Sequence, residues 1–196
     1  ATLDDAVSSL ADYITSHDLN GVTLLGFSLG GVMVTQAAPL VADRLARVVF
    51  HSAVVLRTGE SVFDTVPPKM GQHLRSLTNK GMLTMPHAMF RDRIAAEEDA
   101  ATAQALYDTH SYPHAVSMFD TSVDARAFEN LLAEGLPVSW VEAPNDVLLG
   151  FGRWRWSRFA NRLGTPRVIH LPACGHDAPL THPEATAYAY HKAARA

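Results

Sequence analysis

The stretch Val22-Thr23-Leu24-Leu25-Gly26-Phe27-Ser28-Leu29-Gly30-Gly31 decides the fold. Its first part, Val22–Phe27, is a short apolar run that follows the turn signal Asn20-Gly21, so it predicts a buried parallel strand. Residues 29–38 continue as a helix of small residues, which Pro39 ends or kinks. A strand that turns into a helix at a Gly-x-Ser-x-Gly sequence is the pattern of a nucleophile elbow.

The elbow pattern assigns Ser28 as the candidate nucleophile. A sharp strand-to-helix turn holds such a serine at strained backbone angles. Side chains on either side of the turn would clash, so Gly26 and Gly30 are expected to be required beside Phe27. The backbone N–H of Leu29, at the start of the helix, is the expected oxyanion donor. The alternative is a glycine-rich packing turn with an inert serine.

The base is expected late in the chain, because this pattern orders its residues as Ser, then Asp or Glu, then His. His176 lies in a loop between a predicted strand, residues 167–171, and a helix, which makes it the candidate base. His170 would be fixed within that strand, and His182 is typical of a helix start. His51 is expected to end a strand near the nucleophile.

The acid is expected in the loop after the predicted strand at residues 137–142, where Asp146 stands. Its role would be to hold the imidazole in the productive tautomer. Glu142 is the rival, although it belongs to the end of the strand. The alternative for Asp146 is an Asx-turn that caps the following helix. Asp177 is expected to be a loop or cap residue.

Strand signals alternate with helix signals along most of the chain, which predicts an α/β fold with a parallel sheet flanked by helices. The sequence predicts an α/β core from residues 1–56 and 135–196, and a helical cap insertion at residues 57–134 without a strand. The further elements expected are a strand at 47–53, core helices at 2–17, 151–163 and 183–194, and cap helices at 69–80, 91–108 and 124–134.

The composition limits the partners. The 196 residues are 47% apolar and carry a net charge of −4, which argues against nucleic acid and anionic membranes. Residues 19–42 hold no charge, but glycines, Asn20, Gln36 and Pro39 interrupt them, so no membrane span is expected. Asp4 stands where a signal peptide would be basic, and we expect a cytoplasmic protein.

Several other features suggest no additional chemistry. The sequence shows no metal-ligand spacing and no phosphate loop, so no cofactor is expected. The lone Cys174 is expected to be a buried free thiol. Residues 153–158 mix arginine with tryptophan, but Trp154 and Trp156 cannot share one helical face, which favours a helix with one tryptophan packed inward. Phe90, Phe119 and the methionines of the cap region fit either an apolar acyl pocket or ordinary cap packing.

These residues resemble the α/β-hydrolase superfamily, and more closely the bacterial esterases related to plant methyl esterases and hydroxynitrile lyases. The resemblance implies hydrolysis of a small carboxylic ester through an acyl-enzyme, by a triad of Ser28, Asp146 and His176. It also implies a small-molecule ester as the binding partner. The matching stretches are residues 2–5, 22–31, 44–49, 59–68, 145–146, 155–156 and 175–177, and the cap matches only loosely.

The sequence departs from the family pattern in two places. The family has strands before Thr2, with a His-Gly turn that supplies the second oxyanion N–H. We therefore expect a fragment, a processed form or one half of a two-chain protein. A half-built oxyanion hole would raise the barrier by about 2.7–4 kcal/mol. The lyases carry a lysine after the base, where this chain has Asp177, which disfavours lyase chemistry.

Alternatives to ester hydrolysis stay open at the level of sequence. One is a ligand-binding or scaffold protein that uses this fold without turnover. Another is a lactonase, acyltransferase or lyase that acts through the same triad. A second chain, a missing N-terminal segment or a homo-oligomer stay open as further partners.

Overall fold

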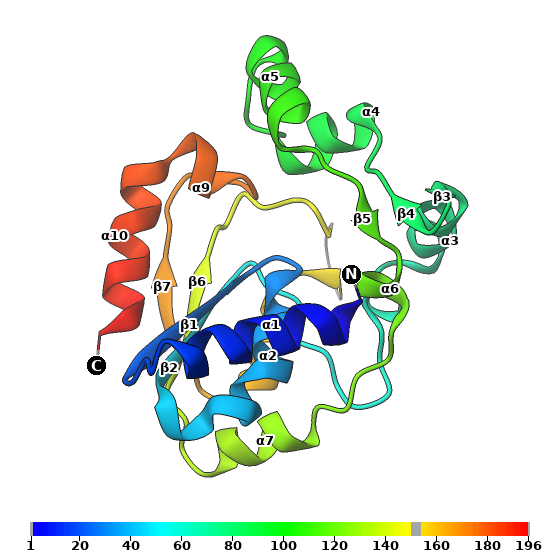
Figure 1. Cartoon of the computed structure of the whole chain (residues 1–196). Helices are drawn as coiled ribbons and strands as arrows, with labels where there is room; N and C mark the ends of the chain where they lie inside the picture. The colour runs from blue at the N-terminus through cyan, green and yellow to red at the C-terminus, as the bar shows by residue number, and fades with distance from the viewer. Residues whose placement is uncertain (1, 150–153, 196) are drawn as a thin grey trace.

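A computed structural model describes residues 2–149 and 154–195. Its centre is a four-stranded parallel sheet in the order β1-β2-β6-β7, as Figure 1 shows. Partner residues in register run across the first three strands, from Phe27 to His51 to Val141. The strands are β1 (Val22–Phe27), β2 (Leu45–His51), β6 (Val138–Glu142) and β7 (Arg167–His170).

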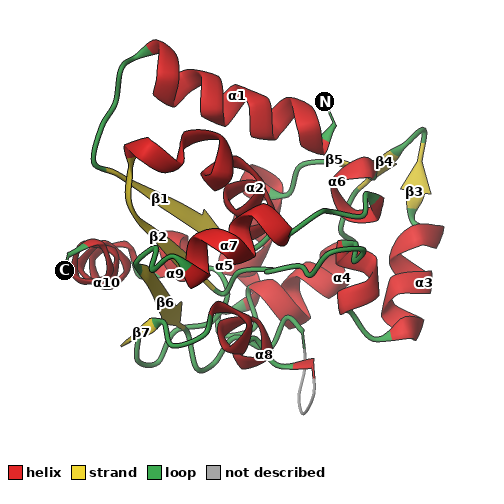
Figure 2. Cartoon of the chain, turned by 90° about the horizontal axis from the view of Figure 1, so that it is seen from below, coloured by secondary structure: helices red, strands yellow, loops and turns green. Residues whose placement is uncertain are grey.

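Helices cover both faces of this sheet, which confirms the predicted α/β fold (Figure 2). On one face α10 packs against β2, β6 and β7. The helices on the other face contribute buried side chains to one apolar cluster. The helices are α10 (Pro183–Ala194) on the first face, and α1 (Leu3–Ser16), α2 (Gly30–Ala37), α7 (Arg126–Ala133) and α8 (Ser157–Ala160) on the second.

Strand β2 shows why the sheet needs both layers. Val48 and Phe50 are fully buried in the cluster with α1, α2 and α7, whereas Val49 is fully buried in the cluster with α10. Successive side chains of a strand point to opposite faces, so a continuous apolar run is stable only when both faces are covered.

The segment between β2 and β6, residues 57–134, includes α7, which packs beneath the sheet. The rest of it lies beside the carboxyl ends of the strands and above them in Figure 1. The elements that precede α7 are short. They are η2 (Val62–Thr65), α3 (Pro68–Ser76), β3 (Thr78–Asn79), β4 (Met82–Leu83), α4 (His87–Met89), the π-helical turn η3 (Phe90–Ile94), α5 (Ala100–His110), β5 (His114–Ala115) and α6 (Ser117–Asp120).

Two expectations for this segment were wrong. It contains a small antiparallel sheet, β3-β4-β5, although no strand was predicted, because two-residue strands are too short to show a period of two. The single helix predicted at 91–108 is instead η3 and α5, separated by a turn. Asp99 starts α5, since its carboxylate accepts the backbone N–H of Thr102 at 2.8 Å and so caps a new helix.

Most other elements match their predictions within a few residues. Strand β1 and helix α10 have the predicted bounds. Helix α2 ends at Ala37, and the 3-10 helix η1 (Ala38–Arg44) takes Pro39 in its first turn. The helix predicted at 151–163 starts outside the described residues and is represented by α8 and η5 (Asn161–Leu163). Among the described residues, no helix is long and apolar enough to cross a membrane.

Candidate active site

Ser28 occupies a strained turn between β1 and α2. Its φ of +52° lies in the left-handed region, which non-glycine residues rarely adopt. Hydrogen bonds to the end of β2 and to the segment that follows it hold this conformation. The Ser28 N–H donates to the carbonyl of His51 at 3.1 Å, and the Ser28 carbonyl accepts the N–H of Val54 at 2.9 Å. The turn therefore carries Ser28 at the carboxyl end of the sheet.

Close packing explains only one of the two glycines of the elbow pattern. A Cβ on Gly26 would lie 2.6 Å from a methyl group of Val34 and 2.9 Å from the Cα of Gly31. A Cβ on Gly30 would meet nothing within 4 Å, so the expected clash at Gly30 was wrong. The second crowded position is Gly31, where a Cβ would lie 2.5 Å from the carbonyl oxygen of Val54.

The structure brings together the three residues predicted to form the triad. The Oγ of Ser28 lies 3.0 Å from Nε2 of His176, and Nδ1 of His176 lies 2.6 Å from Oδ2 of Asp146. With the proton on Nδ1, His176 donates to Asp146 and its Nε2 accepts the hydroxyl of Ser28. This geometry is the one needed to activate a serine nucleophile.

Asp146 is fixed in both its position and its charge. Its side chain is fully buried, and its Oδ1 accepts the backbone N–H of Leu148 at 3.0 Å, so the Asx-turn expected as an alternative coexists with the contact to His176. Burial alone would raise the pKa of Asp146. The positive charge of His176, together with the hydrogen bonds that the carboxylate accepts, outweighs burial and leaves the pKa of Asp146 below its ordinary value.

The loops that carry the acid and the base are joined directly. The N–H of Asn145 donates to the carbonyl of Cys174 at 3.2 Å. Ala173, which begins the base loop, has a φ of +56°, and Ser52 after β2 has a φ of +39°. Together with Ser28, these are three of the five described non-glycine residues with positive φ, so backbone strain concentrates around this site.

Two aromatic rings enclose the imidazole of His176. Trp156 stacks on it with centroids 5.5 Å apart and an interplanar angle of 12°, and Phe27 lies 4.9 Å away. Trp156 is buried, as expected for one tryptophan of this segment. Its contact with His176 was not predicted, because no local pattern links residues twenty positions apart on different loops.

The rival residues occupy other places. His170 ends β7 and its backbone pairs with Glu142 of β6, so it lies in the strand as expected. Its side chain is exposed and lies 3.1 Å from the carboxylate of Glu142. His182 precedes α10 and lies 2.9 Å from the Thr181 hydroxyl. His51 ends β2 and is fully buried, with Nδ1 2.7 Å from the hydroxyl of Tyr190.

The candidate site opens into a cavity of about 490 Å³ between the sheet and the segment that connects β2 to β6. Its walls are largely apolar, and Phe90 and Phe119 belong to them. A larger cavity of about 830 Å³ lies at the opposite edge of the sheet and contains no residue of the triad, so we place the site in the smaller one. The apolar lining is Phe27, Leu29, Met33, Leu74, Leu83, Met85, Phe90, Ile94, Met118, Phe119, Leu148 and Leu180.

The backbone around Ser28 offers one donor to this cavity. Leu29 is the N-cap of α2, and within the described chain its N–H donates to no other backbone group. It lines the cavity beside Ser28, so it is placed to meet a negatively charged oxygen there. In the described ranges, no group of three or more His, Cys, Asp or Glu could hold a metal ion.

A parallel sheet flanked by helices, with a serine, a histidine and an aspartate in contact at its carboxyl edge, is typical of a hydrolase fold. Comparisons with known proteins identify the family. The family model described as "Alpha/beta hydrolase family" matches residues 1–189. The chain therefore belongs to the α/β-hydrolase family. No curated protein sequence matches it.

Solved structures are similar over nearly the whole chain. An extracellular α/β-hydrolase from a Paenibacillus species, described as sharing structural and functional homology with tobacco salicylic acid binding protein 2, is 28% identical with a TM-score of 0.93, covering 100% of this chain and 81% of that one. The methylesterase MES16 from Arabidopsis is 17% identical with a TM-score of 0.68, covering 97% and 76%. The pyrethroid hydrolase PytH is 21% identical with a TM-score of 0.69, covering 99% and 78%.

Proposed function

We propose that this protein is a serine hydrolase that cleaves small carboxylic esters through an acyl-enzyme intermediate. The observation that carries the proposal is the continuous set of contacts from Ser28 Oγ to His176 Nε2 and from His176 Nδ1 to Asp146 Oδ2. The similarity to the Paenibacillus hydrolase, at 28% identity over the whole chain, supports the same class of reaction.

In the first half of the proposed reaction, Ser28 Oγ attacks the ester carbonyl while His176 Nε2 takes the hydroxyl proton. Asp146 stabilises the resulting imidazolium, which its ionised state allows. The N–H of Leu29 donates to the oxyanion. His176 then gives its proton to the leaving alcohol oxygen, and the acyl group stays on Ser28.

In the second half, His176 takes a proton from water, and the hydroxide attacks the acyl carbon. The bond to Ser28 Oγ breaks, and the proton returns from His176 to Ser28. One ester and one water thus give one acid and one alcohol. The apolar walls of the cavity favour an ester with an apolar acyl group, and its volume of about 490 Å³ suits a small molecule.

The test is covalent labelling with a fluorophosphonate probe, followed by peptide mapping and assays of p-nitrophenyl esters. We expect an adduct on Ser28 and hydrolysis of short-chain esters. Ser28→Ala should remove both, and His176→Ala should reduce both by a factor on the order of 10⁴ or more.

A matched control is His170→Ala, which removes an exposed histidine at the end of β7 that contacts Glu142. This variant should label and turn over like the wild type. A folded wild-type protein that forms no adduct would overturn the proposal, as would an adduct on any residue other than Ser28.

A further inference from the structure

Among the described residues, the lining of the cavity contains an acidic side chain but no lysine or arginine. Asp177 is its one acidic lining residue, and the other polar lining residues beyond Ser28 and His176 are His110, Ser111, Tyr112 and His114. The described lining therefore holds one carboxylate, Asp177, that can act as the counter-ion of a cation, and no lysine or arginine that would pair with an anion.

No hydrogen bond within the described part of the chain explains why a carboxylate stands at Asp177. It stands at the N-cap of α9 (Ala178–Thr181), yet its side chain makes no capping hydrogen bond. Its Oδ2 is buried and has no hydrogen-bond partner in the described part of the chain. Burial raises the pKa of Asp177, while the positive charges of His176 and His110 act in the opposite direction. Buried polar atoms are nearly always paired in proteins, so an unpaired one in an active-site cavity points to a ligand.

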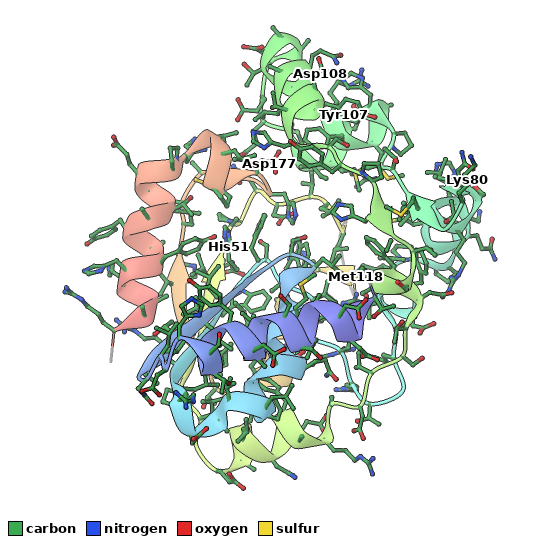
Figure 3. All side chains as sticks on the ribbon, in the orientation of Figure 1. His51, Lys80, Tyr107, Asp108, Met118 and Asp177 are labelled. Carbon is green, nitrogen blue, oxygen red and sulfur yellow. The ribbon has the colours of Figure 1, made fainter. Side chains whose placement is uncertain are left out.

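The aromatic residues of the cavity lining also suit a cation. Phe90, Tyr112 and Phe119 line the same cavity, and the faces of aromatic rings attract ammonium groups. Asp177 directly precedes α9 and Met118 belongs to α6, so different parts of the chain, both labelled in Figure 3, line the cavity. A positively charged group held by Asp177 would therefore be surrounded by apolar and aromatic surface.

The position of Asp177 indicates which part of an ester it meets. In the proposed reaction His176 gives its proton to the leaving oxygen, so the alcohol part must lie beside His176. Asp177 follows His176 directly and lines the same cavity. We propose that the site selects esters whose alcohol part carries an ammonium group, with Asp177 as the counter-ion. This inference rests on the proposed ester hydrolysis.

The test compares two esters of the same shape, butyrylcholine and 3,3-dimethylbutyl butyrate, which differ in the charge of the alcohol part. For the wild type we expect kcat/KM to be at least about tenfold higher for the cationic ester, mainly through KM. In Asp177→Asn this ratio should fall to about one, and Asp177→Glu should restore part of it. Glu98→Gln removes a nearby carboxylate that does not line the cavity, and it should keep the wild-type ratio.

Failure of this inference differs from failure of the proposed function. Hydrolysis of both esters with a ratio near one overturns the cation selectivity and leaves ester hydrolysis standing. If neither ester is hydrolysed, a second measurement tests the cation site. The rate at which a fluorophosphonate labels Ser28 is compared with and without tetramethylammonium, which should protect Ser28 if it binds beside Asp177. Protection that is lost in Asp177→Asn supports the cation site, and the absence of protection overturns it. A protein that cannot be labelled at all overturns the proposed function.

Discussion

At the scale of single residues, the elbow shows the difference between a sequence pattern and the geometry behind it. The pattern marks Gly26 and Gly30, yet the backbone is crowded at Gly26 and Gly31. The reason is that the start of α2 packs closely against the segment after β2. There Ala53 and Val54 leave no room for a side chain on Gly31. The motif predicted the candidate nucleophile, whereas only the packing of a distant segment identified the second crowded glycine.

Two alanine substitutions test this difference. Gly31→Ala should lower stability by several kcal/mol or prevent folding, because its Cβ would lie 2.5 Å from a backbone oxygen. Gly30→Ala should be neutral or stabilise the protein by up to about 1 kcal/mol, since alanine favours a helix more than glycine does. Urea unfolding of both variants measures the effect. Equal destabilisation by the two substitutions would contradict this account.

Asp146 provides a prediction about activity. Asp146→Asn keeps the size of the side chain but removes the charge that stabilises the imidazolium and favours the proton on Nδ1 of His176. We expect kcat to fall by a factor of about 10⁴ with little change in KM. Steady-state hydrolysis of a p-nitrophenyl ester measures both constants. Glu142→Gln is the matched control, because Glu142 contacts His170 on the surface, and it should stay near wild type.

At the scale of elements, the sequence predicted those parts of the fold that have a strong local signal. Strand Val22–Phe27 is mostly apolar, and helix Pro183–Ala194 begins at a proline in its first turn. The β3-β4-β5 sheet was missed because each strand has two residues, and β5 pairs with β4 across more than thirty positions. The candidate triad could be predicted because its chain order and loop positions follow from the strands.

The loop before α8 contributes a contact that no sequence pattern could reveal, and it leads to a prediction. Trp156 stacks on His176, so it should hold the imidazole in line with Ser28 and Asp146. We expect Trp156→Ala to reduce kcat by about 10–100-fold with a smaller change in KM, and Trp156→Phe to recover most of the loss. Trp154→Phe, two residues away, is the control. Equal effects on kcat from Trp156→Ala and Trp156→Phe would contradict a positioning role.

At the scale of the whole molecule, His51 lies where the sheet, the active site and α10 meet. It is labelled at the strands in Figure 3, and Tyr190 of α10 contacts its Nδ1 at 2.7 Å. Its Nε2 is buried without a hydrogen-bond partner among the described residues. The ring also packs against Phe27, whose other neighbour is His176. A proton on His51 would therefore place a charge in the middle of the fold.

The stability of the protein should consequently fall in mild acid. Burial lowers the pKa of His51 from 6.5 to about 4, with help from the positive charge of His176 and opposition from Asp146. Between these pH values the unfolded chain binds a proton that the folded chain excludes, so the free energy of unfolding decreases as the pH drops. The His51 contribution should be about 2 kcal/mol between pH 7 and pH 5.

Urea unfolding across this pH range, compared between the wild type and His51→Asn, isolates that contribution. Carboxylates such as Asp146 also lose stabilising interactions in acid, but they do so in both proteins, so the difference between the two slopes belongs to His51. Tyr190→Phe should lower stability while keeping the pH dependence, because the buried histidine remains. His191→Asn alters an exposed histidine of the same helix and should change neither quantity. Identical slopes for the wild type and His51→Asn would mean that the folded protein admits a proton at His51.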